Sequence, residues 1–284
     1  MRLFVGLTDG GWVERVRALG PGDAYLWRPH QRGFRALAPG EPFLFKLHAP
    51  RDAIVGAGRF VEARRLPLSL AWLAFGPSNG VADPQAFRRR VERAHPGEAG
   101  ADPVLSGVVL DHPAYLAEAD WVPVPADWRP SVAHGKVYDG PAGRALWATV
   151  QERLGPAAAT WDAGDAPLGP GRLRLQVAEA YGRRCAITGE HALATLDVGH
   201  LVPPSQGGPE RVDNALLLRA DLARLLQHGL LTVEPDGFVV RVSAAVRATY
   251  GALDGRALKV VPERFDLLPG REYLEAHRAN AYRA

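Results

Sequence analysis

His200 and Asn214 have side-chain types that could take part in catalysis. A neutral imidazole can take a proton from water, and a carboxamide can donate and accept hydrogen bonds. His200 lies in an apolar run, residues 198–202, which two prolines follow, so we expect it at a rigid strand position. The sequence therefore predicts His200 as a general base, with Asn214 completing the catalytic site.

The elements that must position these side chains follow one another closely. Residues 205–211 contain two glycines and a proline and predict a loop, and the Asn214 amide can hold the two sides of that loop together. Asp221 predicts the N-cap of a short helix through Gln227, and Gly229 marks its end. Strand, loop, strand and helix in this order predict a ββα unit.

A longer pattern surrounds these residues. It consists of Cys185-x-x-Thr188-Gly189, His200-x-x-Pro203, Gly207-Gly208, Asn214 and Leu216-Leu217-Leu218-Arg219. This pattern resembles the HNH nuclease motif, in the subgroup that lacks zinc-ribbon cysteines. The resemblance implies a ββα-metal fold, DNA cleavage of the restriction type, and a divalent ion, Mg²⁺ or Mn²⁺, near His200.

The predicted helix departs from that family at two positions. The family carries a His and an Asp at i and i+4, on one helical face, where this chain has Ala223 and Gln227. Ala cannot bind a cation, and an amide is a weaker ligand than a carboxylate for Mg²⁺. The candidate metal ligands are thus His200, Gln227 and His228, although the helical turn directs His228 away from the face of position 223. Two hypotheses stay open: a metal-dependent endonuclease, and an HNH fold that binds DNA, including modified DNA, without cutting it.

Composition limits the class of protein. A chain of 284 residues with 47% hydrophobic content predicts two folded domains. The net charge of +3 is compatible with a DNA partner and is weak evidence for one, so a protein whose basic faces serve assembly, including a homodimer, is a further alternative. Cys185 is the single cysteine, and we expect it to be a small buried side chain. Without a long apolar run or a leader, the expected location is the cytoplasm and no membrane partner is expected.

Residues rich in glycine and proline separate two halves of the chain. We predict an N-terminal domain at 1–154, a linker at 155–171 and an HNH domain at 172–284. The N-terminal domain alternates strand-like runs with turns, which predicts a mixed sheet; the runs are 2–6, 42–48, 54–61, 105–110 and 121–124. Residues 40–60 resemble the barrel of PUA-like domains, the group that includes ASCH and EVE modules. The predicted fold class is therefore α+β, with a PUA-like mixed β-barrel and a ββα-metal domain.

Five further sequence blocks lie at residues 25–29, 43–48, 69–76, 79–80 and 135–139. With these blocks the whole chain resembles, in order and spacing, a bacterial group of restriction endonucleases that join such a domain to an HNH domain. PUA-like domains of this kind resemble readers that flip out a modified base and hold it between aromatic faces. On this resemblance the base-binding candidates are Trp27, Trp72 and Asn79, with Arg28 and Lys46 as phosphate contacts. The alternative is that the aromatic side chains belong to the hydrophobic core.

Overall fold

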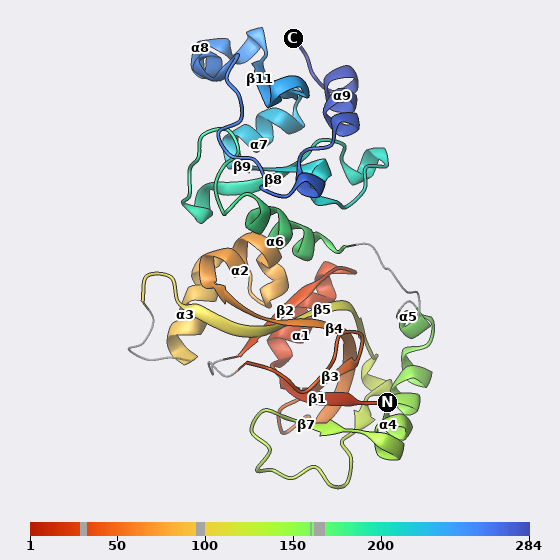
Figure 1. Ribbon diagram of the computed structural model, residues 1–284. Coiled ribbons are helices and arrows are strands. Elements are labelled where there is room, and N and C mark those ends of the chain that lie inside the picture. Colours follow the sequence, from red (N-terminus) through yellow and green to blue (C-terminus); the bar gives the residue numbers. More distant parts are fainter. Residues whose placement is uncertain (29–32, 95–99, 160, 162–167) are drawn as a thin grey trace. The chain divides into compact units, whose positions relative to one another are not determined.

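Strands and helices alternate along the whole chain in the computed structural model, which describes residues 1–28, 33–94, 100–159, 161 and 168–284. Internal contacts divide the chain into two units, Met1–Gly171 and Arg172–Ala284. Each unit contains helices and strands, so the α+β class predicted from the sequence is confirmed (Figure 1). Among the described residues, no helix is both long and apolar enough to cross a membrane.

The first unit is built on a mixed sheet of seven strands in the order β2-β5-β4-β3-β1-β7, with β6 paired to β4. β1 and β3 run parallel, and the other neighbours run antiparallel. The strands are β1 Leu3–Thr8, β2 Ala24–Arg28, β3 Pro42–Leu47, β4 Ala53–Pro67, β5 Val104–Tyr115, β6 Val122–Pro123 and β7 Gly135–Tyr138.

All five strands expected in this unit exist, and two of them are longer than expected. β4 continues to Pro67 because it pairs there with Val104 of β5, and β5 continues to Tyr115 because it pairs there with Gly56 of β4. β2 and β7 were not among the strands predicted from the sequence. Both are short edge strands, and tertiary pairing rather than local pattern defines them.

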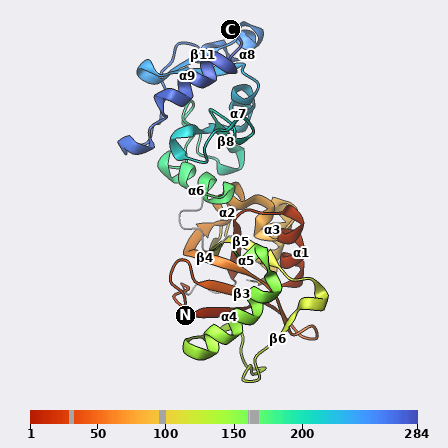
Figure 2. The ribbon, with the colours of Figure 1, turned by 90° about the vertical axis from the view of Figure 1, so that its right-hand side faces the viewer.

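Strand alternation gives this sheet two apolar faces. Leu3 and Val5 of β1 pack with Trp147 and Val150 of helix α4 (Gly140–Leu154). Phe4 points to the opposite face and packs with the hydrophobic residues of helix α1 (Gly10–Leu19). The sheet is therefore covered by a helix on each face (Figure 2).

The hydrogen-bonded ladder of this sheet is open between its edge strands, β2 and β7. A side chain links these edges instead: Arg28, at the end of β2, donates from Nη1 to the carbonyl of His134, just before β7, at 3.1 Å. The predicted barrel is thus incompletely closed by backbone pairing, because β7 spans only residues 135–138.

Short helices complete the first unit. They are α2 Leu68–Phe75, η1 Gly76–Asn79, α3 Pro84–Ala94, η2 Glu118–Asp120 and α5 Pro156–Ala159. Helix α5 lies inside the segment 155–171 that was predicted to be a linker. Three alanines after a proline at the first helical position account for the helix.

The second unit places two strand pairs beside helices. Helix α6 (Pro170–Ala180) leads into it, and the pairs are β8 with β9 and β10 with β11. The second pair is an antiparallel hairpin, with Leu231 opposite Val242. The elements are β8 Leu196–His200, β9 Ala215–Arg219, α7 Ala220–Gln227, β10 Leu231–Glu234, β11 Val239–Val242, α8 Arg247–Tyr250 and α9 Arg271–Asn280.

Candidate functional site

Helix α7 lies directly against the strand that carries His200 (Figure 1). β8 and β9 are antiparallel, with His200 opposite Ala215. A Cβ placed on Gly199 would lie 2.9 Å from Cδ2 of Leu226 in α7 and 3.8 Å from the Cα of Ala223. An alanine at position 199 would require the Leu226 side chain to shift, so glycine suits the close packing of the helix on the strand. Gly199 thus helps to place the helix beside the strand that carries the imidazole.

Asn214 closes the loop between the two strands. Its side chain is fully buried, and its Oδ1 accepts from the backbone N–H of Val202 at 2.9 Å. Its Nδ2 donates to the carbonyls of Val202 at 2.8 Å and Pro209 at 2.9 Å. The amide thus contacts both sides of the loop, as expected from the sequence. Gly208 is also required there, since a Cβ would lie 1.8 Å from the Val202 carbonyl oxygen.

His200 ends β8 with its imidazole partly open to solvent. Its Nε2 lies 3.3 Å from Oε2 of Glu210, and the two side chains are 23% and 24% exposed. A carboxylate beside one ring nitrogen orients an imidazole and stabilises its protonated form. Glu210 was not among the candidates from the sequence. The available signal was an acidic residue inside the predicted loop, four positions before Asn214.

The start of α7 differs from the prediction. The N-cap is Arg219, and Asp221 is the second residue of the helix. The Asp221 carboxylate accepts from Nε and Nη2 of Arg219 at 2.7 Å each and from the Tyr250 hydroxyl at 3.1 Å. The Arg219 hydrogen bonds are the main reason that the pKa of Asp221 lies below its ordinary value. The prediction of an Asp221 cap was wrong because the guanidinium of Arg219 binds the carboxylate.

The helix positions expected to bind metal do not form a ligand group. Ala223 is 1% exposed and faces β8, whereas Gln227 and His228 are exposed near the end of the helix. The structure describes every residue of 172–284, and within this range no three His, Cys, Asp or Glu side chains are grouped so that they could hold a metal ion. Within this range, Glu210 is the one hydrogen-bonding partner of the His200 imidazole.

Cys185 is buried, as expected, and organises the backbone near α7. Its Sγ accepts the N–H of Thr188 at 3.4 Å and the N–H of Arg219 at 3.2 Å. The thiol therefore ties the Cys-x-x-Thr-Gly turn to the N-cap of the helix. This contact accounts for the Cys-x-x-Thr part of the sequence pattern.

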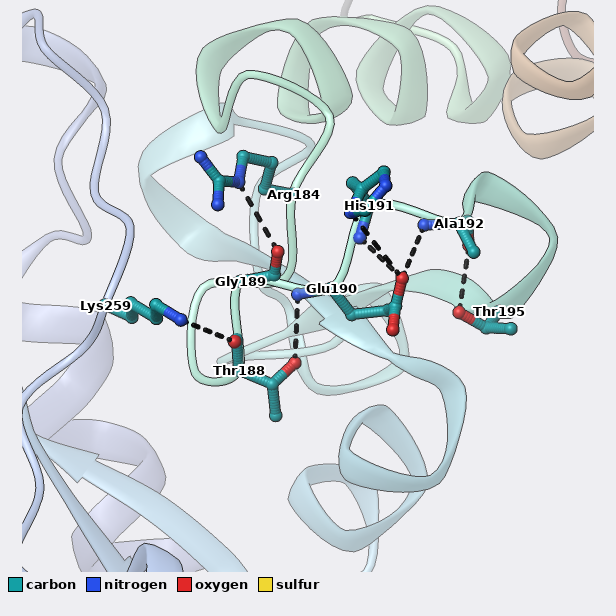
Figure 3. A network of polar contacts seen from close by, with 8 residues as sticks. All are labelled: Arg184, Thr188, Gly189, Glu190, His191, Ala192, Thr195 and Lys259. Carbon is teal, nitrogen blue, oxygen red and sulfur yellow. Dashed lines mark hydrogen bonds and ion pairs between the residues drawn. The ribbon is translucent and has the colours of Figure 1, made fainter.

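The same turn is held from outside by polar side chains (Figure 3). Arg184 donates from Nε to the Gly189 carbonyl, and Lys259 donates from Nζ to the Thr188 carbonyl, both at 3.4 Å. Glu190 accepts the N–H groups of the two residues that follow it, at 2.7 Å each. These backbone donors, that of Ala192 first, lower the pKa of Glu190. The turn is thus fixed on its inner and outer sides.

In the first unit, the base-binding candidates Trp27 and Trp72 are half-buried beside Phe87 of α3. Their ring centroids lie 6.0 and 6.4 Å from that of Phe87. Asn79 is buried, and its Nδ2 donates to the carbonyls of Ala71 at 2.9 Å and Gly76 at 2.8 Å. Its amino group is therefore engaged within the helical turn, and the two tryptophans pack as part of a hydrophobic cluster.

The two expected phosphate contacts have different environments. Lys46 is 2% exposed, pairs with Asp52 and lies 5.0 Å from the ring centroid of Trp128, and this burial is evidence against a phosphate contact. Arg28 is surrounded by aromatic rings, with its Cζ 5.3 to 5.8 Å from the centroids of Phe4, Phe34 and Phe43. Burial lowers the pKa of Arg28 to about 10, so the guanidinium is still cationic at neutral pH.

The strand pair, loop and helix around His200 form an HNH endonuclease domain. Residues 185–234 match the family model described as HNH endonuclease, which confirms the resemblance seen in the sequence motif. A search of curated proteins finds no match to this chain.

Solved structures give more distant similarities. ASCH from Zymomonas mobilis is 11% identical, with a TM-score of 0.35 over 51% of this chain and 94% of that chain. A mutant of the same protein is 9% identical, with a TM-score of 0.37 over 51% of this chain and 96% of that chain. The modification-dependent TagI restriction endonuclease is 13% identical, with a TM-score of 0.35, and the similarity covers 84% of this chain and 60% of that chain.

Proposed function

We propose that this protein is a DNA endonuclease of the restriction type, whose HNH domain hydrolyses phosphodiesters with His200 as general base. The observation that carries the proposal is the pair formed by the partly exposed imidazole and the Glu210 carboxylate, 3.3 Å apart. When Glu210 accepts the Nε2 proton, Nδ1 is the basic nitrogen of the ring. A base held at a strand end by a carboxylate is well placed to activate water.

The reaction uses the side chains as follows. Nδ1 of His200 takes a proton from water while the water oxygen forms a bond to phosphorus. The P–O bond to the leaving oxygen breaks, and the leaving oxygen keeps the electron pair and takes a proton from solvent. The carboxylate of Glu210 stabilises the imidazolium that results. Asn214 does not take part in the proton transfer; its three hydrogen bonds hold the loop that presents Glu210 to His200.

A divalent ion, Mg²⁺ or Mn²⁺, is the cofactor expected of an HNH endonuclease. The side chains here do not fit a metal centre with three protein ligands, because position 223 is an alanine and His200 and Glu210 provide only two ligand groups. We therefore assign no catalytic step to a metal, and the metal requirement is a variable in the experiment below.

The first unit is proposed to direct the nuclease to base-modified DNA. Support comes from the resemblance of its sequence to PUA-like modules. The structure contributes a separate observation, since the first unit has its own sheet and two apolar clusters, independent of the HNH domain. A recognition module and a nuclease module in one chain would couple the presence of a modified base to cleavage.

One observation favours a second candidate function. Ala223, at the position of the family's histidine, is 1% exposed and packs against the strand of His200. A buried apolar side chain here is what an HNH fold without metal would need. In this alternative the domain binds DNA, including modified DNA, and does not cut it.

Cleavage of plain and base-modified duplex DNA by the full-length protein, in Mg²⁺, Mn²⁺ or EDTA, tests these functions. We expect His200→Ala to lower the single-turnover rate by roughly 100-fold or more and Glu210→Gln by roughly 10- to 100-fold, with DNA affinity unchanged. His191→Ala, an exposed histidine of the same domain, is the matched control and should cleave normally.

Cleavage that survives His200→Ala would contradict the assignment of the general base. Binding without cleavage, on every duplex and in every metal, would establish the second candidate instead. Equal cleavage of plain and modified DNA would support the endonuclease activity. It would contradict the proposed role of the first unit in directing the enzyme to modified DNA.

A further inference from the structure

A small pocket opens on the sheet of the first unit, where β2, β5 and β4 are neighbours. Ser106 of β5 is opposite Arg28 of β2 and also opposite Arg65 of β4. Residues paired in this way project from the same face, so the three side chains form one row across three strands. Phe34 also lines the pocket. We call the site formed by Arg28, Phe34, Arg65 and Ser106 the Arg28 pocket.

Ser106 contributes a hydroxyl that no protein group satisfies. The residue is 6% exposed, and its Oγ is buried without a hydrogen-bond partner although it lines the pocket. Nearly all buried polar groups in folded proteins are hydrogen-bonded, and leaving one unpaired is unfavourable. A ligand that accepts a hydrogen bond from Ser106 would remove this cost.

Arg28 contributes a positive charge that is partly buried. Its Nη1 donates to the His134 carbonyl, while Nε and Nη2 are buried without a partner. Within the part of the chain that the structure describes, Arg28 forms no ion pair, and the nearby acid Glu62 is paired with Arg64 at 2.8 Å. A buried cation is expensive without a counter-ion, and aromatic rings compensate only part of that cost. The site therefore favours an anion.

The size of the pocket limits what can enter. Its volume is about 50 Å³, whereas a single water needs roughly 10–15 Å³ on this scale. The pocket thus accepts about four water-sized atoms. A tetrahedral group with four oxygens matches this size, and a nucleobase, with at least eight heavy atoms in an aromatic ring system, does not.

We propose that the Arg28 pocket binds a phosphate group, with Ser106 and Arg28 as buried hydrogen-bond donors and Arg65 as a cation at the exposed mouth. The proposal rests on the proposed function in one respect, because a DNA strand is the expected source of the phosphate. Free phosphate or a nucleotide offers the same chemistry. A phosphate anchored here would fix a strand on the first unit without reading its bases.

Binding measurements in EDTA test this proposal without any cleavage. The full-length protein is titrated with inorganic phosphate up to tens of millimolar, and with a short duplex that ends in a 5′-phosphate or a 5′-hydroxyl. We expect Ser106→Ala and Arg65→Ala each to raise the Kd for phosphate roughly tenfold, as loss of one charged hydrogen bond predicts. Arg89→Ala, an exposed arginine of the same unit, is the control and should bind normally.

The titrations with duplex DNA identify the source of the bound phosphate. A parallel loss of duplex affinity in both variants supports a DNA phosphate, and a loss restricted to the 5′-phosphorylated duplex supports a strand end. Loss of inorganic phosphate binding alone supports a free anion. Equal phosphate affinity in wild type, Ser106→Ala, Arg65→Ala and Arg89→Ala, or no phosphate binding by the wild type, would overturn the proposal.

A measurement of thermal stability checks independently that the Ser106 hydroxyl has no hydrogen-bond partner in the protein. Because the Ser106 hydroxyl is unpaired, Ser106→Ala should keep or raise the melting temperature without ligand, and phosphate should stabilise the wild type more than the variant. A lower melting temperature in the variant would mean that the hydroxyl already has a partner and would contradict the inference. Both readouts are independent of nuclease activity, so the nuclease proposal can fail while this one holds, and the reverse.

Discussion

The carboxylate that faces His200 comes from the loop between β8 and β9, not from the helix where the HNH family carries its acid. The position of His200 followed from local pattern, because an apolar run before two prolines predicts a strand end. Glu210 could not be predicted in the same way. Its position depends on how residues 203–214 fold back, which the Asn214 hydrogen bonds and the close approach of Gly208 to Val202 determine.

At the residue scale, the absent helix ligands can be restored. We expect Ala223→His with Gln227→Asp to raise Mn²⁺ affinity by at least roughly tenfold, the factor that about 1.4 kcal/mol of added binding energy gives. Because position 223 is buried against Gly199, the histidine should also lower stability by about 1–3 kcal/mol.

Isothermal titration with Mn²⁺ and urea unfolding measure the two effects of this double variant. Gln227→Asp alone is the control, since it adds a carboxylate at an exposed site without overpacking. Unchanged Mn²⁺ affinity in a folded double variant would show that positions 223 and 227 do not face the site of His200.

At the scale of elements, the local sequence pattern predicts that a helix or strand exists, whereas side-chain hydrogen bonds determine where it begins. The end of α7 at Gln227 was predicted correctly, and its start was not, because the competition between Arg219 and the helix N-terminus for Asp221 is invisible in local sequence. Similarly, the local pattern predicted β8 but not the edge strands β2 and β7, which pair with strands distant in the chain.

The Asn214 side chain should be essential to the loop. Asn214→Ala removes three hydrogen bonds and leaves the N–H of Val202 and two carbonyls without their partner, so we expect a loss of about 2–4 kcal/mol in the free energy of unfolding. Urea unfolding of the full-length protein measures it, with the exposed Asn280→Ala as control. A change below about 0.5 kcal/mol would mean that the loop keeps its shape without this amide.

His277 should make the attachment of α9 depend on pH. It is buried, with Nδ1 2.9 Å from Oγ1 of Thr232 and Nε2 3.0 Å from the Leu226 carbonyl, and burial lowers its pKa below the ordinary 6.5. The unfolded chain therefore binds this proton more readily than the folded chain. Stability is complete above about pH 6.5 and falls as the pH decreases toward the folded pKa, by about 1.4 kcal/mol for each unit of pKa difference.

Urea unfolding at pH 7.5, 6.5 and 5.5 tests this dependence. The decrease in stability between pH 7.5 and 5.5 should be smaller in His277→Gln than in the wild type. His191→Gln, at an exposed histidine, should keep the wild-type dependence. An identical decrease in all three proteins would show that His277 does not contribute to the pH response.

At the scale of the whole molecule, each unit has a hydrophobic core of its own. Residues 172–284 enclose Val177, Leu217, Leu226, Val240 and Leu274, all fully buried, within that unit. The sequence could indicate two parts from the glycine- and proline-rich stretch between them. Helix α5 could not be predicted from the sequence, because residues 155–171 consist largely of residues that break helices.

We expect a fragment of residues 172–284 to fold by itself and to unfold cooperatively in urea. Such a fragment should bind DNA without distinguishing plain from base-modified duplexes, because the proposed recognition module has been removed. Circular dichroism and DNA-binding titrations measure both properties, with the full-length protein as reference. A fragment that stays unfolded, or that still discriminates, would contradict this division of roles.

The chain carries one thiol, and it lies beneath the turn that meets the N-cap of α7. A thiol reagent can therefore modify the protein only when this region opens, so the rate of alkylation reports the opening equilibrium directly. No engineered label is needed, and no second cysteine contributes background. The alkylation rate of Cys185 thus measures local opening of the HNH domain, and it can be compared with and without DNA.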